Sequence, residues 1–243
     1  KVYDDQDSGN ICFGTEKDGQ RYFVKFAGAP TEQFGGDPAD AISRLKATLP
    51  IYSDLKHENL IELIEAKEIG DGFAMVFKWA DSDCMGRMYP AAHRRFMQLP
   101  INDRLAVFSD ILSFLECVAS RKYVAIDFYD GSIMYDFANG KTTICDIDLF
   151  HKQPCVNDMG RMWGSSRFQS PEEYQLGADI DEITNVYTLG ATAFALFGEY
   201  NRTREKWQLS DKLFEIATRA VSDDRTKRQQ SIRQFTAEWE AAQ

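Results

Sequence analysis

The chain has 243 residues, which is enough for one sizeable core or two small lobes and too few for several independent domains. Hydrophobic residues make up 44% and charged residues 27%, which excludes wholesale disorder and fibrous repeats. The 28 Lys and Arg residues stand against 38 Asp and Glu, and the net charge of -10 repels nucleic acid and anionic lipid, so we expect neither as a partner.

The first part of the chain predicts a β-hairpin followed by a helix. Residues 11–14 and 21–26 are rich in β-branched and aromatic side chains, and the Asp-Gly at residues 18–19 is typical of a turn between two strands. Pro38 is suited to a first helical turn, and apolar residues then recur at spacings of three and four. Pro50 is expected to bend or end this helix.

The pattern changes from strands to helices near residue 80. Residues 60–66 and 72–79 read as two more strands around a Gly-Asp-Gly turn. Residues 102–120 then carry apolar side chains on one helical face, another helix begins near Asp181, and a last one passes through Trp239. We therefore predict an α+β fold with two lobes.

The predicted boundary between the lobes lies near residues 78–83. The N-terminal lobe, residues 1–80, is a small antiparallel sheet with one helix, and the C-terminal lobe, residues 81–243, is larger and mostly helical. Within the second lobe, the basic run at residues 93–95 is most simply a solvated helix face.

A second hairpin is predicted inside the helical part. Residues 133–135 and 142–144 form a strand pair around Asn139-Gly140, which is a strong short-range hairpin signal. Antiparallel strands bring their outer ends together, so Ser132 before the first strand and Asp146 after the second should be neighbours. Asp127 lies one short loop upstream.

These side chains are suited to metal and hydroxyl chemistry. A hard divalent cation takes oxygen ligands, and an alcohol nucleophile needs a carboxylate that orients or accepts its proton. Asp127, Asp146 and Ser132 supply two carboxylates and a hydroxyl. The alternative is structural, because Asp127 and Asp130 would also serve as caps of ordinary turns.

The sequence around these residues resembles the protein-kinase family. The resemblance begins in the N-terminal lobe. Residues 22–26, YFVKF, resemble the V-A-I-K strand, with Lys25 as the lysine. Residues 57–61, HENLI, resemble the H-x-N-I/L-I/V turn after the family's regulatory helix. Residues 74–79, AMVFKW, are similar to the strand that enters the adenine-binding hinge, with Phe77 as gatekeeper.

The resemblance continues through the C-terminal lobe in the family's order. Residues 125–132, AIDFYDGS, occupy the place of the catalytic loop H-R-D-x-x-x-x-N, and residues 143–148, TICDID, that of D-F-G. Residues 164–172, GSSRFQSPE, look like the end of an activation segment. Residues 185–190, NVYTLG, resemble D-V-W/Y-S-L-G, and residues 224–228, DRTKR, resemble D-P-x-x-R. A divergent serine/threonine kinase of bacterial type fits these matches.

The resemblance implies an ATP and Mg²⁺ site. Asp127 would orient the acceptor hydroxyl, assisted by Ser165, and Asp146 and Ser132 would bind magnesium. Lys25 would hold the α and β phosphates. The other residues on the nucleotide side would be Gly9, Phe77, Lys78, Trp79 and Ala80. The last Arg of residues 224–228 would pair with Glu172.

Several departures fall on residues that have assigned roles in the family. Ala125 and Ile126 stand where the catalytic-loop His and Arg would be, and Asn185 replaces the Asp that supports that loop. Residues 40–56 contain no Glu to pair with Lys25. In addition, the place of the Gly-rich loop is taken by Asp4, Asp5, Gln6, Asp7, Ser8 and Gly9, an acidic run that repels a triphosphate.

The register of the metal motif has two readings. Asp148 stands where the family has Gly, so residues 146–148 could offer two carboxylates, or Asp148-Leu149-Phe150 could itself be the motif. We favour Asp146, because Thr143-Ile144-Cys145-Asp146 resembles the usual sequence before D-F-G. Asp148 is the alternative ligand or a turn cap.

Three functions are consistent with these residues. The first is an ATP-dependent serine/threonine protein kinase, the second a pseudokinase that binds or scaffolds, and the third a small-molecule kinase of the aminoglycoside or sugar type. The run Asp130-Gly131-Ser132 resembles the x-G-N of the third group, whereas residues 164–172 resemble a peptide-docking segment that this group generally lacks.

The expected location is the cytoplasm. The five cysteines are scattered and show no C-x-x-C spacing, which fits reduced thiols. No apolar run approaches the ~18 residues that a membrane helix needs, and no secretory signal opens the sequence. The sequence makes no prediction of the oligomeric state.

Overall fold

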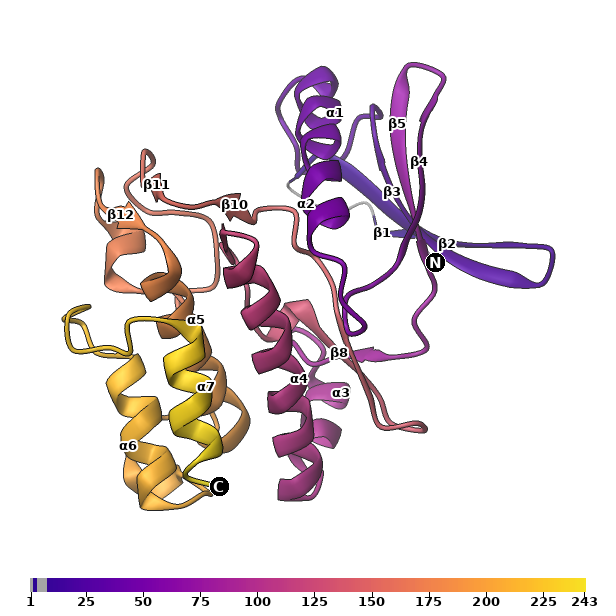
Figure 1. Ribbon diagram of the computed structural model, residues 1–243. Helices are drawn as coiled ribbons and strands as arrows, with labels where there is room; N and C mark the ends of the chain where they lie inside the picture. Colours follow the sequence, from indigo (N-terminus) through magenta and orange to yellow (C-terminus); the bar gives the residue numbers. More distant parts are fainter. Residues whose placement is uncertain (1, 4–7) are drawn as a thin grey trace. The chain divides into compact units, whose positions relative to one another are not determined.

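The computed structural model describes residues 2–3 and 8–243, and the chain divides into two compact units (Figure 1). Unit 1 is Lys1–Asp81 and unit 2 is Ser82–Gln243. Unit 1 contains an antiparallel sheet with short helices, and unit 2 is rich in helices with short strand pairs. The fold is therefore α+β.

The sheet of unit 1 has the strand order β1-β2-β3-β5-β4 with antiparallel neighbours. The predicted first hairpin is confirmed, since its strands pair from Asn10 with Ala27 to Lys17 with Gln20. Asp18 and Gly19 form the turn in left-handed conformations, with φ of 54° and 74°. The strands are β1 (Val2–Tyr3), β2 (Asn10–Lys17), β3 (Gln20–Ala27), β4 (Leu63–Ile69) and β5 (Gly72–Lys78).

The helical segment of unit 1 is divided into two helices just before Pro50, as the sequence predicts. Helix α1 (Pro38–Ala47) begins after Asp37, whose side chain accepts a hydrogen bond from the Ala39 amide. Helix α2 (Leu49–Asp54) begins anew with Pro50 in its first turn. Helix α1 packs on β3 and β5 and buries Leu45.

The last three helices of unit 2, α5 to α7, begin at polar caps and bury apolar residues. Asp181 accepts from the Ile183 amide, Ser210 from that of Leu213 and Ser231 from that of Gln234. The helices of unit 2 are α3 (Pro90–Met97), α4 (Ile101–Ser120), α5 (Glu182–Phe197), α6 (Asp211–Ala220) and α7 (Ile232–Glu240). Among the helices of the described chain, none is long and apolar enough to cross a membrane.

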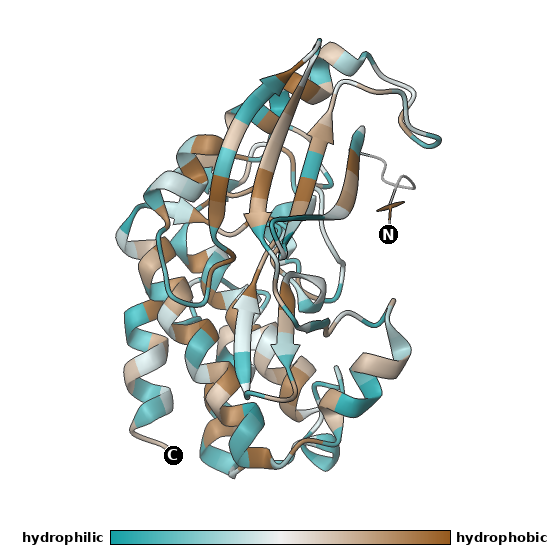
Figure 2. Cartoon of the chain, turned by 90° about the vertical axis from the view of Figure 1, so that its right-hand side faces the viewer, coloured by the Kyte–Doolittle hydropathy of each residue, from teal (hydrophilic) through white to brown (hydrophobic). Residues whose placement is uncertain are grey.

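An aromatic cluster forms the core between helices of unit 2. Helix α4 packs on α5 and α7, and the ring centroids of Phe108 and Trp239 lie 4.7 Å apart. The Phe235 ring stacks on Trp239 at 5.6 Å, and Phe197 meets Phe108 edge-on at 5.7 Å. Brown and teal segments alternate along many of the elements in Figure 2, as expected where one side is buried and the other solvated.

Short strands complete unit 2. The sheet β6-β8-β9 contains the predicted second hairpin, whereas the pairs β7 with β10 and β11 with β12 had no signal in the sequence. The strands are β6 (Asp83–Cys84), β7 (Tyr123–Val124), β8 (Ile133–Asp136), β9 (Lys141–Ile144), β10 (His151–Lys152), β11 (Cys155–Val156) and β12 (Asp179–Ile180).

Candidate active site

The loop at residues 125–132 is held in place by the buried helix α5. The Ala125 amide donates to Oδ1 of Asn185 at 2.7 Å, and Nδ2 of Asn185 donates to the Tyr123 carbonyl at 3.0 Å. Asn185 is fully buried, so an unmade bond here would leave a buried polar group unpaired. Asn satisfies both backbone groups, whereas an ionised Asp would lack the donor.

The second hairpin brings Ser132 and Asp146 to the same end, as the sequence predicts. Ile133 of β8 pairs with Ile144 of β9, and the Cys145 amide donates to the Ser132 carbonyl at 2.9 Å. Asp146 is therefore the second residue beyond this pair, and it is exposed.

Asp127 and Asp146 share an unusual backbone conformation. Their φ angles are 61° and 57°, in the left-handed region that residues other than glycine enter at a cost. Asp tolerates this region better than most residues, because its short side chain bonds locally. Such conformations cluster at functional sites, where the surrounding structure holds them.

Both carboxylates act electrostatically on Tyr129. Burial is the main effect that raises the pKa of the Tyr129 phenol, and the negative charges of Asp146 and Asp127 raise it further. The tyrosine ring lies over Gly131, where an added Cβ would come within 2.6 Å of the phenol oxygen. Asp127 of the loop and Asp146 after β9 thus both raise the pKa of the same phenol.

The segment at residues 164–172 passes beside Asp127. A Cβ on Gly164 would lie 3.4 Å from Oδ1 of Asp127, and Gly164 has a φ of 135°. Ser165 is half-buried, and its carbonyl accepts from the Phe168 amide at 2.9 Å. Ser165 thus follows a glycine whose missing side chain would face Asp127, while the role of Ser165 in positioning the acceptor stays a prediction.

The predicted nucleotide residues of unit 1 lie on or next to two neighbouring strands. Lys25 lies on β3 between Cys12 of β2 and Met75 of β5, and its side chain is half-buried. Phe77 is fully buried, with its ring 5.1 Å from that of Tyr52. Phe77 thus belongs to the core of unit 1, and its role as gatekeeper stays a prediction.

The residues that follow Phe77 differ in exposure. Lys78 is exposed and its amide donates to the Glu62 carbonyl at 2.9 Å. The Trp79 indole donates to Asp81 at 3.2 Å, and its ring lies over Gly14, where a Cβ would come within 2.8 Å. Ala80 is half-buried.

The predicted phosphate loop is described in part. Residues 4–7, which include Asp4, Asp5 and Asp7, lie outside the described residues. Gly9 is buried in a left-handed conformation with a φ of 77°, and a Cβ there would lie 2.6 Å from the Phe34 ring. The close approach of this aromatic ring explains why position 9 takes glycine.

The donors at the end of the second hairpin are of the kind that Mg²⁺ takes. Mg²⁺ is usually held by one or two carboxylates together with substrate phosphates and water. Asp146 supplies an exposed carboxylate, and the buried Ser132 hydroxyl makes no hydrogen bond within the described part of the chain. Asp148 is half-buried two residues further on. Within residues 2–3 and 8–243, no three His, Cys, Asp or Glu side chains form a metal site by themselves.

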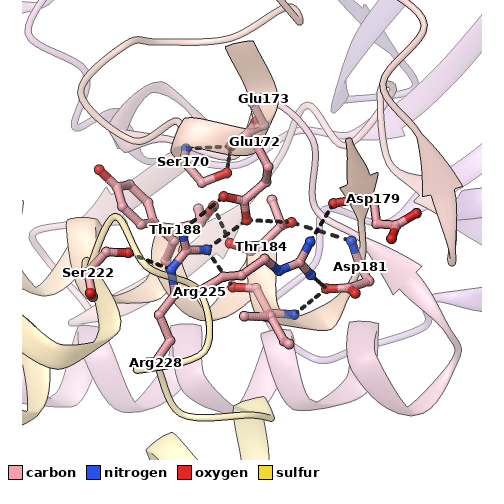
Figure 3. Close-up of polar contacts among 12 residues, drawn as sticks. Ser170, Glu172, Glu173, Asp179, Asp181, Thr184, Thr188, Ser222, Arg225 and Arg228 are labelled. Carbon is pink, nitrogen blue, oxygen red and sulfur yellow. Dashed lines mark hydrogen bonds and ion pairs between the residues drawn. The ribbon is translucent and has the colours of Figure 1, made fainter. Parts of the chain in front are cut away.

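The predicted pair of Glu172 and Arg228 is confirmed (Figure 3). Arg228 donates to both carboxylate oxygens, at 2.7 and 2.9 Å, and its Nε donates to the Ser222 carbonyl at 2.7 Å. Burial alone would raise the pKa of Glu172, but the hydrogen bonds and charge of Arg228 outweigh it, and the pKa is lowered. This pair anchors the end of residues 164–172 to the turn before α7.

A second buried carboxylate, Glu173, was missed by the sequence analysis. Its Oε2 accepts from the Ser170 amide at 2.6 Å and from the Ser170 hydroxyl at 2.8 Å (Figure 3). Burial, the largest effect, raises the pKa of Glu173 to about 7 although these hydrogen bonds lower it, and the charges of Glu172 and Asp127 raise it further. A Ser three residues before a Glu was the available signal.

We expect Glu173 to make stability fall as the pH rises from about 4.5 to about 7. The unfolded carboxyl ionises near 4.5 and the folded one near 7, so its stabilising contribution is complete below 4.5 and lost as the pH passes 7. Across this window the difference in unfolding free energy between wild type and Glu173→Gln should change by about 3 kcal/mol. Urea titrations at a series of pH values measure it, and a constant difference would contradict the shift.

A buried network at Asp130 was also missed. Arg167 donates to both oxygens of Asp130, at 3.0 and 3.2 Å, and the Tyr200 hydroxyl donates to Oδ2 at 2.6 Å. Asp130 is 3% exposed, so these hydrogen bonds replace the water that an exposed carboxylate would contact. The network joins the loop at residues 125–132, the segment at residues 164–172 and the turn after α5. Residues 37 and 70 positions apart give no sequence signal of contact.

Comparisons with family models and with curated proteins found no match. The function is therefore inferred from the placement of the chain's own residues.

Proposed function

We propose that the chain has a protein-kinase-like fold and is an ATP-dependent phosphotransferase that acts on serine or threonine hydroxyls of proteins. The observation that carries the proposal is the pair Asp127 and Asp146. Both residues adopt left-handed conformations, Asp127 in the loop before the second hairpin and Asp146 just after it, and the charges of both raise the pKa of Tyr129. Two carboxylates held in this way are suited to phosphoryl transfer, which depends on positioning and charge neutralisation.

Each residue has a distinct role in this proposal. Asp127 orients the acceptor hydroxyl and accepts its proton, with Ser165 beside it. Asp146 and Ser132 hold magnesium, with Asp148 as the alternative ligand, and Lys25 binds the α and β phosphates. Bound magnesium would supply positive charge that neutralises the phosphates. The adenine would contact the strand end at residues 77–80.

The anchored segment favours a protein acceptor over a small molecule. Residues 164–172 are fixed by the pair of Glu172 and Arg228 and by the contact of Arg167 with Asp130. A segment held beside Asp127 in this way is suited to docking a peptide, which supports the protein kinase over the sugar or aminoglycoside kinase.

A pseudokinase is the second candidate, and Gly9 favours it. An aromatic ring, Phe34, fills the space where a Cβ of Gly9 would stand, whereas a phosphate loop needs room for the ligand beside its backbone. In a pseudokinase, unit 2 would serve as a binding module. Its anchored segment, residues 164–172, would still bind a partner protein.

Addition of ATP with magnesium should raise the melting temperature of the protein. A ligand at 100 times its dissociation constant adds about 2.7 kcal/mol, which for a chain of this size is a shift of roughly 5–10 °C. Thermal-shift assays with ATP, with and without Mg²⁺, measure it. No shift in either condition would refute the enzyme, and a shift without phosphate transfer to protein substrates would favour the pseudokinase.

A further inference from the structure

A surface groove of about 420 Å³ lies in unit 2 next to the Asp130 network. It runs between α3 and the turn after α5, and Tyr200 belongs both to its wall and to the network. The residues that line it are Arg87, His93, Arg94, Met97, Gln98, Glu199 and Tyr200. We call it the basic groove.

The charge of the basic groove is opposite to that of the whole chain. Arg87 and Arg94 are exposed, while the acidic side chain in the described lining is Glu199, which has Lys206 at 4.0 Å. The chain as a whole carries -10. Charges more than about 8 Å away are screened at physiological salt, so the two arginines govern what binds locally.

The wall of the groove is held by a strained turn. Glu199 and Tyr200 are consecutive residues with φ of 52° and 64°, a conformation that residues other than glycine rarely adopt. The Tyr200 amide donates to the Phe194 carbonyl at 3.0 Å. The guanidinium groups of Arg87 and Arg167 lie 5.2 and 4.9 Å from the Tyr200 ring centre. The turn therefore holds Tyr200 in position relative to Asp130. The contact with the Tyr200 ring in turn positions Arg87.

We propose that the basic groove binds an acidic segment, rich in Asp and Glu, of the protein whose hydroxyl accepts the phosphate. This inference rests on the proposed function and names its substrate class. Arg87 and Arg94 pair with the carboxylates of the segment, and the Tyr200 ring supports the guanidinium group of Arg87. Since Tyr200 is bonded to Asp130, a segment in the groove is attached close to the loop that carries Asp127.

Two labelled peptides test the groove. Both carry one serine, flanked in the first by glutamates and in the second by glutamines at the same positions. Fluorescence anisotropy without nucleotide measures binding at ~0.15 M salt, and labelled ATP measures transfer. We expect the wild type to bind the glutamate peptide about tenfold more tightly, and the double variant Arg87→Gln/Arg94→Gln to lose this preference.

Arg95→Gln is the matched control for Arg94→Gln alone, because each of these variants removes one positive charge whereas the double variant removes two. Arg94 and Arg95 are neighbours in the last turn of α3 and both exposed, so their substitution has the same effect on net charge and helix dipole. Arg95 instead lies 3.9 Å from the centre of the Phe137 ring and within 4.0 Å of Asp83. The Arg95→Gln variant should therefore keep the full preference for the glutamate peptide over the glutamine peptide. Melting temperatures of all three variants establish that they fold.

The outcomes distinguish failure of the proposed binding in the basic groove from failure of the proposed phosphate transfer. Equal affinity of the wild type for both peptides overturns the inference, as does an equal loss of preference in Arg94→Gln and Arg95→Gln. If both peptides are phosphorylated at equal rates and bind equally, the inference fails and the proposed function stands. Selective binding lost in the double variant, without any phosphate transfer, refutes the proposed function and leaves a binding site for acidic segments.

Discussion

We expect Asp127→Asn to lower the rate of phosphate transfer by about 10³-fold at unchanged stability. The amide cannot accept the proton of the acceptor hydroxyl, so the rate falls while ATP binding is kept. Asn is chosen because it tolerates the left-handed conformation of Asp127, whereas Ala would add strain that confuses stability with catalysis. Steady-state rates with protein substrate, together with melting temperatures, measure the effect.

Asp146→Asn should give a comparable loss that depends on magnesium. An amide is a weaker ligand than a carboxylate for this hard cation, so the magnesium concentration needed for half-maximal rate should rise. Asp148→Asn tests the alternative that Asp148 is the magnesium ligand. In that case Asp148→Asn, and not Asp146→Asn, should raise the magnesium concentration needed for half-maximal rate. A loss shared equally by both variants would indicate that both carboxylates bind.

Asp18→Asn is the matched control for both catalytic variants. Asp18 also has a left-handed backbone, with φ of 54°, and lies exposed in the turn between β2 and β3. The chemical change is identical and the role in the proposed reaction is absent, so its rate should equal that of the wild type. Equal rates in Asp18→Asn, Asp127→Asn and Asp146→Asn would show that these aspartates are not the catalysts.

Arg228→Met should destabilise the protein by about 3–5 kcal/mol. The guanidinium side chain is fully buried and donates to both oxygens of Glu172, which is itself 6% exposed (Figure 3). Its removal leaves Glu172 buried without the cation, and Thr184 at 3.1 Å is too weak a partner to compensate. Urea unfolding at neutral pH measures the loss.

Arg225→Met provides the comparison inside the same cluster. Arg225 bonds to Asp181 and to the Asp179 carbonyl, but its side chain is 28% exposed, so solvent can replace the lost bonds. Its cost should stay within about 1 kcal/mol. The double variant Arg228→Met/Glu172→Met should be less destabilised than Arg228→Met alone, since no charge remains buried. Similar costs for Arg225→Met and Arg228→Met would contradict this account.

Long periodic elements and tight turns were predictable from the sequence. The helix expected at residues 102–120 is α4 (Ile101–Ser120), and the Asn-Gly hairpin is β8 and β9. In both, local pattern and turn chemistry determine the structure. The pairs β7 with β10 and β11 with β12 were not predictable, because two-residue strands carry no periodicity. Strand β4 begins at Leu63, three residues later than expected.

The candidate site was predictable where residues are close along the chain. The hairpin places Ser132 beside Asp146, and a family pattern placed Glu172 with Arg228. The Asp130 network was not predictable, since Tyr200 reaches it from 70 positions away. The left-handed conformations of Asp127 and Asp146 had no sequence signal either, because Asp is common in ordinary turns.

The contact between Tyr129 and Gly131 makes these two positions change together. Any side chain at position 131 would meet the tyrosine ring, with a Cβ 2.4 Å from its Cε2. The substitution Gly131→Glu would therefore displace the tyrosine ring from its place over residue 131. Homologues that carry a larger residue at position 131 should have a smaller or more flexible residue at position 129. If the residue types at positions 129 and 131 covary in this way, homologues with glycine at position 131 are the ones in which tyrosine is retained at position 129.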